Sequence, residues 1–267
     1  MWRGLAIVAS LFAGAAQGDE TWSRGSEAYV ETEARAPEGS DPARPAWPVS
    51  ARLSHPTDRY DHDVLGGIPS WANLGVGALS CGACRRGSEG ATVVLPENMV
   101  FEDVAPRLWD VTGDGRPEIV VVESHVTRGA RLAVWTYSDT GADLTRLART
   151  AFIGQRHRWL APAGVGDFDG DGQIEIAYVD RPHLLRELVF VRLEGDTLRE
   201  VARVPDLTNH QIGDSFISGG TRNCGQGDEV ILANADWSRV MATRMGQVPV
   251  DLGPYSKSAM KQALACG

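Results

Sequence analysis

The sequence predicts an all-β fold built from repeated units, and three observations support this prediction. Residues 110–122 (DVTGDGRPEIVVV) and 167–179 (DFDGDGQIEIAYV) align without gaps at a spacing of 57 residues, and the ending of this segment recurs at 228–233. Residues 131–150 and 187–204 each give an apolar strand, a polar turn with glycine and a second strand, which is typical of a β-hairpin. The 30 Gly and 14 Pro among 267 residues indicate many turns rather than long helices.

Each repeat contributes three or four short strands, and we trace four units that begin near Val49, Ala91, Leu144 and Leu198. Repeats of about 50 to 57 residues that bury strands against their neighbours favour a small β-propeller of four to five blades. A two-sheet sandwich is the alternative, but a sandwich does not require its strands to repeat. We expect one short helix, over residues 256–265.

The chain divides into three segments. Residues 1–18 carry a charge at Arg3, an apolar run and small residues after it, which is the pattern of a secretory signal peptide. The apolar run is too short to span a membrane, and no later run is longer. Residues 19–48 are acidic and Pro-punctuated, so we expect an extended arm, and residues 49–267 form the propeller domain. The mature protein is therefore expected to be periplasmic or secreted.

Composition narrows the function classes. The 26 basic and 35 acidic residues give a net charge of −9, which argues against nonspecific binding to nucleic acid. The four cysteines allow three pairings in an oxidising compartment, and we favour Cys81 with Cys84 and Cys224 with Cys266. A zinc site at Cys81 and Cys84 is the alternative to the first pair.

The acidic segments carry oxygen-bearing side chains at alternate positions, which suits a hard cation such as Ca²⁺. In the second segment the predicted ligands are Asp167, Asp169, Asp171, the backbone carbonyl of Gln173, and Glu175. In the first segment they are Asp110, Thr112, Asp114, the backbone carbonyl of Arg116, and Glu118. Because the hydroxyl of Thr112 replaces a carboxylate, we expect the first site to be weaker.

Other types of loop were considered for these acidic segments. An EF-hand needs its bidentate Glu at loop position twelve and flanking helices, whereas Glu175 is ninth and a strand follows it. Ordinary Asp-Gly turns are the alternative for both loops. In the third segment the ligand positions fall on Gly220, Arg222 and Cys224, so we expect no ion there and expect Arg222 to take the cation's place beside Asp228 or Glu229.

The loops resemble the FG-GAP or VCBS repeats of integrin-like β-propellers, whose Asp-x-Asp-x-Asp-Gly-x-x-Asp/Glu loops hold calcium between strands. The resemblance covers roughly residues 49–250 and is most specific at 167–175 and 110–118. It implies one or two structural calcium ions. The four traceable units are fewer than the blades of the integrin type, so it implies a smaller ring or part of a larger assembly.

Three histidines raise a second metal hypothesis. His62, His157 and His210 occupy matching positions upstream of the acidic segments, and Glu102 or Asp103 holds that position in the fourth unit. Equivalent positions in a closed ring converge on its axis, where three imidazoles and a carboxylate would suit zinc or another transition metal. The alternative is that each histidine bonds locally within its own unit.

No serine-nucleophile motif, phosphate-binding loop or dinucleotide fingerprint is present, and we predict no catalytic residue. The favoured function is an exported calcium-binding β-propeller that acts as a binding or scaffold module for protein or carbohydrate, with calcium in a structural role. The alternative is an extracytoplasmic hydrolase or metal-dependent enzyme that uses the propeller face. Five tryptophans could either pack in the repeat core or stack on sugars, and we favour packing for them: Trp71, Trp109, Trp135, Trp159 and Trp237.

Overall fold

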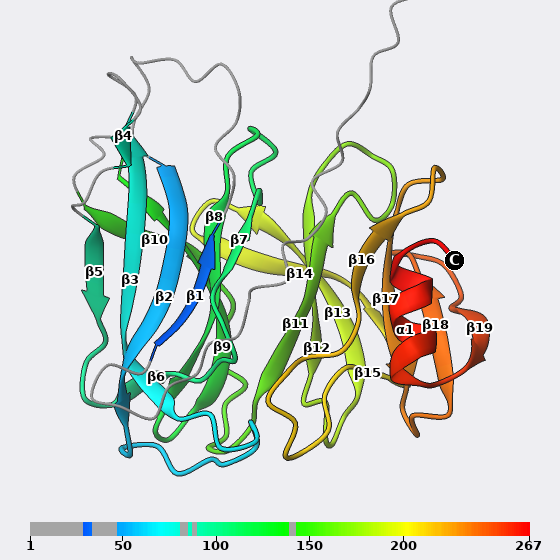
Figure 1. The fold of residues 1–267 in the computed structure, drawn as a ribbon, viewed down its shortest axis with the longest axis horizontal. Helices are drawn as coiled ribbons and strands as arrows, with labels where there is room; N and C mark the ends of the chain where they lie inside the picture. The colour runs from blue at the N-terminus through cyan, green and yellow to red at the C-terminus, as the bar shows by residue number, and fades with distance from the viewer. Residues whose placement is uncertain (1–28, 34–46, 81–84, 87–89, 139–142) are drawn as a thin grey trace, which may run out of the picture.

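The computed structural model describes residues 29–33, 47–80, 85–86, 90–138 and 143–267, and within them the fold is almost entirely β-sheet (Figure 1). Four antiparallel, mostly four-stranded units follow one another along the chain. The expected helix is present as α1 (Lys257–Leu264), and the Ser256 side chain caps it by accepting a hydrogen bond from the Ala259 N–H. The pairing expected for Cys81 and Cys84 lies outside the described residues.

Unit 1 begins upstream of the segment expected to start the domain. Its strands are β1 (Tyr29–Glu33), β2 (Trp47–Thr57), β3 (Ser70–Ser80) and β5 (Ala91–Val94), paired in that order. Strand β1 therefore lies within the expected arm. Two short strands accompany the unit: β4 (Arg85–Arg86) pairs with β3, and β6 (Met99–Phe101) links β3 to the next unit.

The other three units are meanders. Unit 2 consists of β7 (Arg107–Trp109), β8 (Glu118–His125), β9 (Gly129–Tyr137) and β10 (Leu144–Arg149). Unit 3 consists of β11 (Leu160–Gly166), β12 (Glu175–Asp180), β13 (Glu187–Glu194) and β14 (Thr197–Val204). Unit 4 consists of β16 (Gly220–Asn223), β17 (Asp228–Asn234), β18 (Arg239–Thr243) and β19 (Val250–Pro254), with β15 (Leu207–Thr208) also paired to β17.

The unit boundaries expected near Ala91, Leu144 and Leu198 are wrong. All three residues lie on strands that close the preceding unit, because β5 pairs with β3, β10 with β9 and β14 with β13. The two hairpins predicted at 131–150 and 187–204 are confirmed by the same pairings. The two strands of each hairpin are joined by a ladder of backbone hydrogen bonds, so both strands belong to the same unit and the unit ends after the hairpin.

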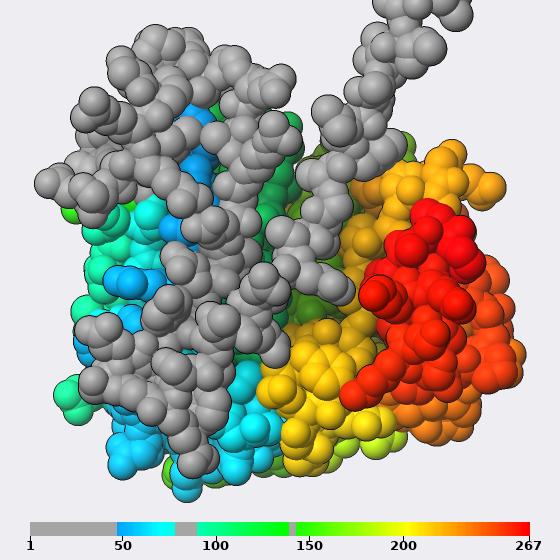
Figure 2. Space-filling model, viewed as in Figure 1, coloured from blue at the N-terminus to red at the C-terminus, as the bar shows by residue number. Residues whose placement is uncertain are grey.

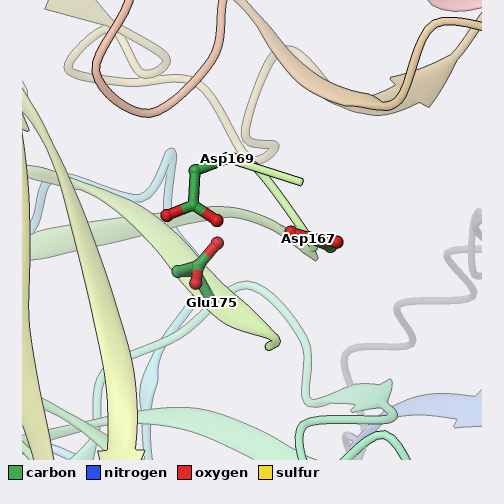
Figure 3. Close-up of side chains that lie close together, drawn as sticks. All are labelled: Asp167, Asp169 and Glu175. Carbon is green, nitrogen blue, oxygen red and sulfur yellow. The ribbon is translucent and has the colours of Figure 1, made fainter. Parts of the chain in front are cut away.

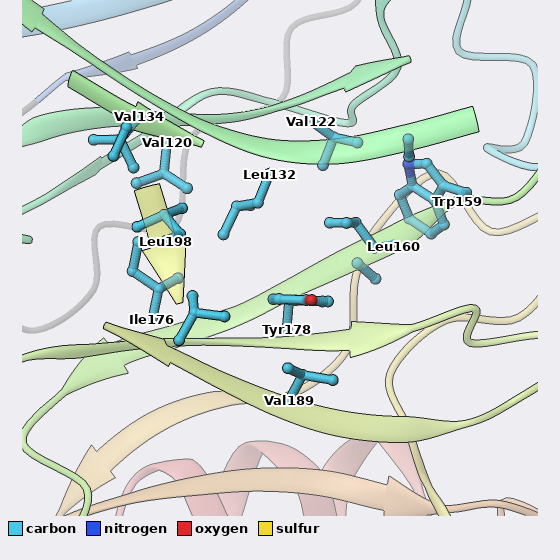
Figure 4. Close-up of a cluster of buried hydrophobic side chains, with 14 of the residues drawn as sticks. Val120, Val122, Leu132, Val134, Trp159, Leu160, Ile176, Tyr178, Val189 and Leu198 are labelled. Atoms are coloured by element: carbon cyan, nitrogen blue, oxygen red, sulfur yellow. The ribbon is translucent and has the colours of Figure 1, made fainter. Parts of the chain in front are cut away.

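Neighbouring units pack face to face, which explains the apolar runs in their central strands. In β8, Ile119 and Val121 face unit 1, while Val120 and Val122 face unit 3. Figure 4 shows this second interface, where Val120 lies on the side of Leu198 and Ile176, and Val122 lies on the side of Leu160 and Trp159. Strand β12 repeats the pattern toward units 2 and 4. Because both faces are buried, period-two alternation of polar and apolar residues is lost.

Helix α1 covers the far face of unit 4, where Met260 and Ala263 pack on Ile231 and Val240. In Figure 2 the helix and the strands beside it form one edge of the molecule. The expected disulfide between Cys224 and Cys266 is confirmed and ties the residues after α1 to the end of β16. The stacking of antiparallel units is β-propeller-like, which agrees with the predicted fold class.

Three of the tryptophans pack in these cores. Trp71 and Trp159 are fully buried, and Trp135 is nearly so. These rings stabilise the interfaces between units and offer no exposed platform for a sugar. Within the described parts of the chain, no helix is long and apolar enough to cross a membrane.

Candidate metal centre

The two predicted calcium loops occupy equivalent places in units 2 and 3. Residues 110–117 connect β7 to β8, and residues 167–174 connect β11 to β12. In each unit the last predicted ligand, Glu118 or Glu175, is the first residue of the second strand. The ligand spacing therefore places one end of each loop on a rigid, buried strand.

The second loop is held by its own first aspartate. Asp167 Oδ1 accepts hydrogen bonds from the N–H groups of Gly170 (2.7 Å) and Asp171 (3.1 Å), and Oδ2 accepts one from Gly172 (3.0 Å). Gly170 and Gly172 have φ angles of 80° and 85°, which a side chain would strain. The loop thus turns its backbone N–H groups toward Asp167.

The first loop repeats this arrangement. Asp110 accepts hydrogen bonds from Gly113 (2.7 Å), Asp114 (3.1 Å) and Gly115 (2.8 Å). The terminal glutamates also match, since Glu118 Oε2 accepts from Val111 N–H at 2.8 Å and Glu175 Oε2 accepts from Phe168 N–H at 2.9 Å. The alignment made from sequence therefore extends to individual hydrogen bonds.

Three predicted ligands converge in the second loop. Asp167, Asp169 and Glu175 each offer a carboxylate oxygen within 4.8 Å of the other two, and no other group of three potential ligands among the described residues meets this criterion. Figure 3 shows Asp169 and Glu175 facing each other, with Asp167 to one side. Asp171 instead accepts hydrogen bonds from the Gln173 N–H (2.8 Å) and from its side-chain amide (3.1 Å).

In the first loop the predicted ligands lie on the same backbone but are less closely gathered. Thr112 Oγ1 lies 3.5 Å from Glu118 Oε1, and Asp114 Oδ1 accepts from the Arg116 N–H at 2.9 Å. The Arg116 guanidinium lies 4.8 Å from the centre of the Trp47 ring, so this loop also contacts unit 1.

Sequence reasoning missed Arg192, which lies among the carboxylates of the second loop. Its Nη2 is 2.8 Å from Asp169 Oδ2 and 2.9 Å from Asp171 Oδ2, and its Nε donates to Glu175. The β12–β13 register brings it there, because Arg192 pairs with Glu175. In unit 2, the register that pairs Ile119 with Trp135 places Thr136 opposite Glu118, so the first loop has no matching arginine.

Burial and charge make the two glutamates differ from ordinary surface acids. Burial, together with the carboxylates of Asp110 and Asp114, raises the pKa of Glu118 to about 7. Burial also raises the pKa of Glu175, but Arg192 opposes that shift. Without a cation, the first loop therefore relieves its charge by holding a proton, and the second by recruiting an arginine.

A family model described as the FG-GAP-like repeat matches residues 110–178, which span both loops from Asp110 to Tyr178 of β12. Residues 110–178 therefore form an FG-GAP-like repeat segment. No curated protein and no solved structure gives a significant match. The FG-GAP repeats and the propeller-like fold support a binding or scaffold module in general.

The third FG-GAP-like segment carries an arginine where the others carry acids. Residues Gly220 and Arg222 belong to strand β16, and Cys224 forms the disulfide. Arg222 Nε donates to Glu229 Oε1 at 2.8 Å, which confirms the contact expected from the sequence, and Nη1 donates to the Ala263 carbonyl at 2.6 Å. The arginine thus joins unit 4 to helix α1.

The histidines of the second metal hypothesis lie at the end of the strands opposite to the acidic loops. Strand β12 starts in the second acidic loop and ends just before the turn that carries His183. His62 and His157 stack with ring centres 5.1 Å apart. The Nδ1 of His62 lies 2.5 Å from Oε1 of Glu102, which is buried. His157 Nε2 lies 2.9 Å from Asp61 Oδ1 at the exposed rim.

His210 does not join that stack but pairs with His183, which no sequence pattern indicated as a partner. His183 Nε2 and His210 Nδ1 are 2.8 Å apart. Burial lowers the pKa of both rings, and it is the main cause of the fall of the His183 pKa to about 4, with smaller contributions from His210, His62 and Arg186. Both rings are therefore neutral at pH 7. The three histidines matched by sequence take different partners, and Asp103 pairs with Arg107 instead.

Proposed function

We propose that this protein is an exported binding module in which calcium holds the acidic loops of units 2 and 3 rigid. The cation's ligands are Asp167, Asp169, Asp171, the Gln173 carbonyl and Glu175 in one loop, and Asp110, Thr112, Asp114, the Arg116 carbonyl and Glu118 in the other. Calcium takes six to eight oxygen ligands, which these loops supply together with water. Its role is structural, and the exposed loops of the units contact a protein or carbohydrate ligand.

The observation that carries the proposal is the repeated hydrogen-bond pattern of the two loops. In both, the first aspartate accepts three backbone N–H groups and the terminal glutamate accepts one. An ordinary Asp-Gly turn needs no buried glutamate, yet Glu118 and Glu175 are both buried. Glu175 is paired with Arg192, whereas Glu118 accepts hydrogen bonds from Val111 and Thr112. A buried carboxylate without a cation is costly, so the first loop in particular favours an ion.

Two further parts of the proposal rest on other observations. The Cys224–Cys266 disulfide is typical of an oxidising compartment and supports export. The four antiparallel units support four propeller-like blades, the lower number expected from the sequence, with α1 and not a further sheet on the far face of unit 4.

Elemental analysis tests the calcium sites directly. Protein purified from an export host without chelator is compared with Asp169→Asn plus Asp171→Asn. We expect one or two calcium ions per chain, fewer in the variant, and a lower melting temperature when EGTA is added. The matched control is Glu194→Gln plus Asp196→Asn, which removes two exposed acids in the turn of the β13–β14 hairpin. Calcium absent from both wild type and variant, with a melting curve insensitive to EGTA, would contradict the proposal.

A further inference from the structure

One carboxylate of unit 4 reaches across to the second acidic loop of unit 3. Asp228 is the first residue of β17, and its Oδ2 accepts a hydrogen bond from the Asp167 N–H at 3.0 Å. Its Oδ1 accepts one from the Asn223 side-chain amide at 2.9 Å, which orients the carboxylate. Asp228 does not belong to the group of three carboxylates that converge in the loop. It therefore holds the backbone of a predicted calcium ligand without being a ligand itself.

A backbone hydrogen bond fixes the next residue of the loop to unit 4 as well. The Phe168 carbonyl oxygen accepts from the Met245 N–H at 3.1 Å, just after β18. The Phe168 ring is fully buried and packs with Val230 and Leu232 in the core between units 3 and 4. The two residues with which the loop begins are therefore held by two separate segments of unit 4.

Unit 3 leaves room for the carboxylate of unit 4 at Gly166, the last residue of β11. A Cβ atom on Gly166 would lie 2.6 Å from Asp228 Oδ2 and 2.9 Å from Asp228 Cβ, which is closer than side-chain atoms pack. A larger residue at position 166 would therefore push Asp228 away from the Asp167 N–H. Gly166 and Asp228 thus form a matched pair across the interface between the two units.

The first acidic loop has a different neighbour at the equivalent position. Ile174 precedes Glu175 as Asp228 precedes Glu229. A Cβ atom on Gly113 of the first loop would lie 3.5 Å from Ile174 Cγ1, so unit 3 meets that loop with an apolar side chain. An alkyl group accepts no hydrogen bond from a backbone N–H. The carboxylate contact therefore distinguishes the second loop from the first.

We infer that Asp228 is a positioning residue for the second acidic loop, so that calcium binding there and the docking of unit 4 on unit 3 strengthen each other. This inference rests on the calcium role proposed above. Asp167 organises the loop by accepting three of its N–H groups, and Asp228 places Asp167. Coupling between two binding events is reciprocal, so calcium should stabilise the docked form by the free energy that docking adds to calcium binding. Calcium should therefore protect unit 4, which contributes none of the predicted ligands.

Calorimetry tests the effect of Asp228 on the ion. Asp228→Ala and Gly166→Ala should each weaken calcium binding to the second loop by about 10-fold to 100-fold, as loss of a group that orients a ligand typically does. Asp228→Asn keeps one acceptor oxygen and should give an intermediate loss. The first loop should keep its affinity in all three variants, and the Asp169→Asn plus Asp171→Asn variant identifies its share of the binding heat.

Hydrogen exchange tests the effect of the ion on unit 4. In the wild type, Ca²⁺ should slow amide exchange at residues 167–174 and also at Met245, whereas in Asp228→Ala the protection of Met245 should be lost. Asp251→Ala is the matched control, because this exposed aspartate of unit 4 pairs with Arg239 and leaves the loop untouched. It should bind calcium as the wild type does.

Three results decide the inference. Urea unfolding with and without Ca²⁺ separates positioning from general destabilisation: an Asp228→Ala variant that is less stable but keeps the full calcium-induced gain overturns the inference. Calcium that protects residues 167–174 of the wild type but not Met245 also overturns it and leaves the calcium proposal in place, a comparison that needs no variant to fold. A wild type in which calcium changes exchange at neither place contradicts the calcium proposal and the inference together.

Discussion

Arg192 gives the second acidic loop a cation of its own. Its guanidinium contacts Asp169, Asp171 and Glu175, three of the residues predicted to bind calcium. A calcium ion that enters the loop must displace this group or share its carboxylates. The second loop has more carboxylates than the first but also an internal competitor, so the two effects on calcium affinity oppose each other.

Arg192→Met separates these effects. Methionine keeps much of the side-chain length but removes the charge, so we expect calcium to bind the second loop about 10-fold more tightly, or about 1.4 kcal/mol. Isothermal titration calorimetry measures the change. Arg199→Met is the control, because Arg199 pairs with Glu194 at the exposed end of the same hairpin. Equal or weaker binding in Arg192→Met would show that the arginine organises the loop for the ion.

Glu118 predicts a pH dependence of the calcium-free protein. Its pKa is about 7 in the fold and 4.5 in the unfolded chain, so the native state binds the proton more tightly. The stability that this group contributes is fully present below pH 4.5 and is lost as the pH rises through about 7. Urea unfolding with EGTA, in wild type and Glu118→Gln, isolates the effect. The wild type should lose stability relative to the variant over this interval, and the opposite slope would contradict the assignment.

At this scale the sequence predicts what is local and misses what depends on register or packing. The ligand set of each loop is encoded within nine residues, so Asp167 and Glu175 could be paired without a structure. Arg192 reaches Glu175 only through the β12–β13 pairing, and counting outward from the 181–186 turn would have found it. His183 could not be assigned, because its partner depends on how the turn packs against Trp159.

At the scale of elements, helix α1 is held to unit 4 by three kinds of contact. Met260 and Ala263 pack on the sheet, Arg222 donates to the Ala263 carbonyl, and Cys266 is bonded to Cys224. The short helix buries little surface by itself, so the covalent link has a large effect on how firmly it stays in place.

Cys224→Ser plus Cys266→Ser measures that effect. The bond closes a loop with a sequence separation of 42, so its removal should lower the free energy of unfolding by about 4 kcal/mol. Urea unfolding without reductant gives the value. For comparison, Ser256→Ala removes only the helix cap and should cost about 1 kcal/mol. A double variant no less stable than the cap variant would show that packing alone holds α1.

At the scale of the whole molecule, stability is shared through the interfaces between units. Repetition in the sequence revealed the all-β class, whereas the extent of each unit required the strand pairing. The residues near Ala91, Leu144 and Leu198 were assigned to the wrong unit because a strand pattern does not indicate on which side the strand pairs. The apolar runs in β8 and β12 are typical of strands that are buried on both faces, as these two strands are.

Phe190→Ala tests whether the units unfold together. The ring is fully buried between units 3 and 4 and packs against Phe168 at 5.2 Å between ring centres. We expect a loss of about 3 to 5 kcal/mol, with a single transition seen by both circular dichroism and tryptophan fluorescence. Leu184→Ala, at a site that is 62% exposed, should change stability by less than about 0.5 kcal/mol. Two separate transitions in Phe190→Ala would show that unit 4 folds on its own.

The position of α1 has a consequence for where the stack of units ends. A sheet that receives its neighbour on one face offers a similar face to the next sheet, so a stack of units has no inherent end. Here Ile231 and Val240 would form such a face, and the helix occupies it instead of another sheet. Helix α1 therefore takes the place on unit 4 that a further sheet takes in a longer stack, and the Cys224–Cys266 bond holds it there.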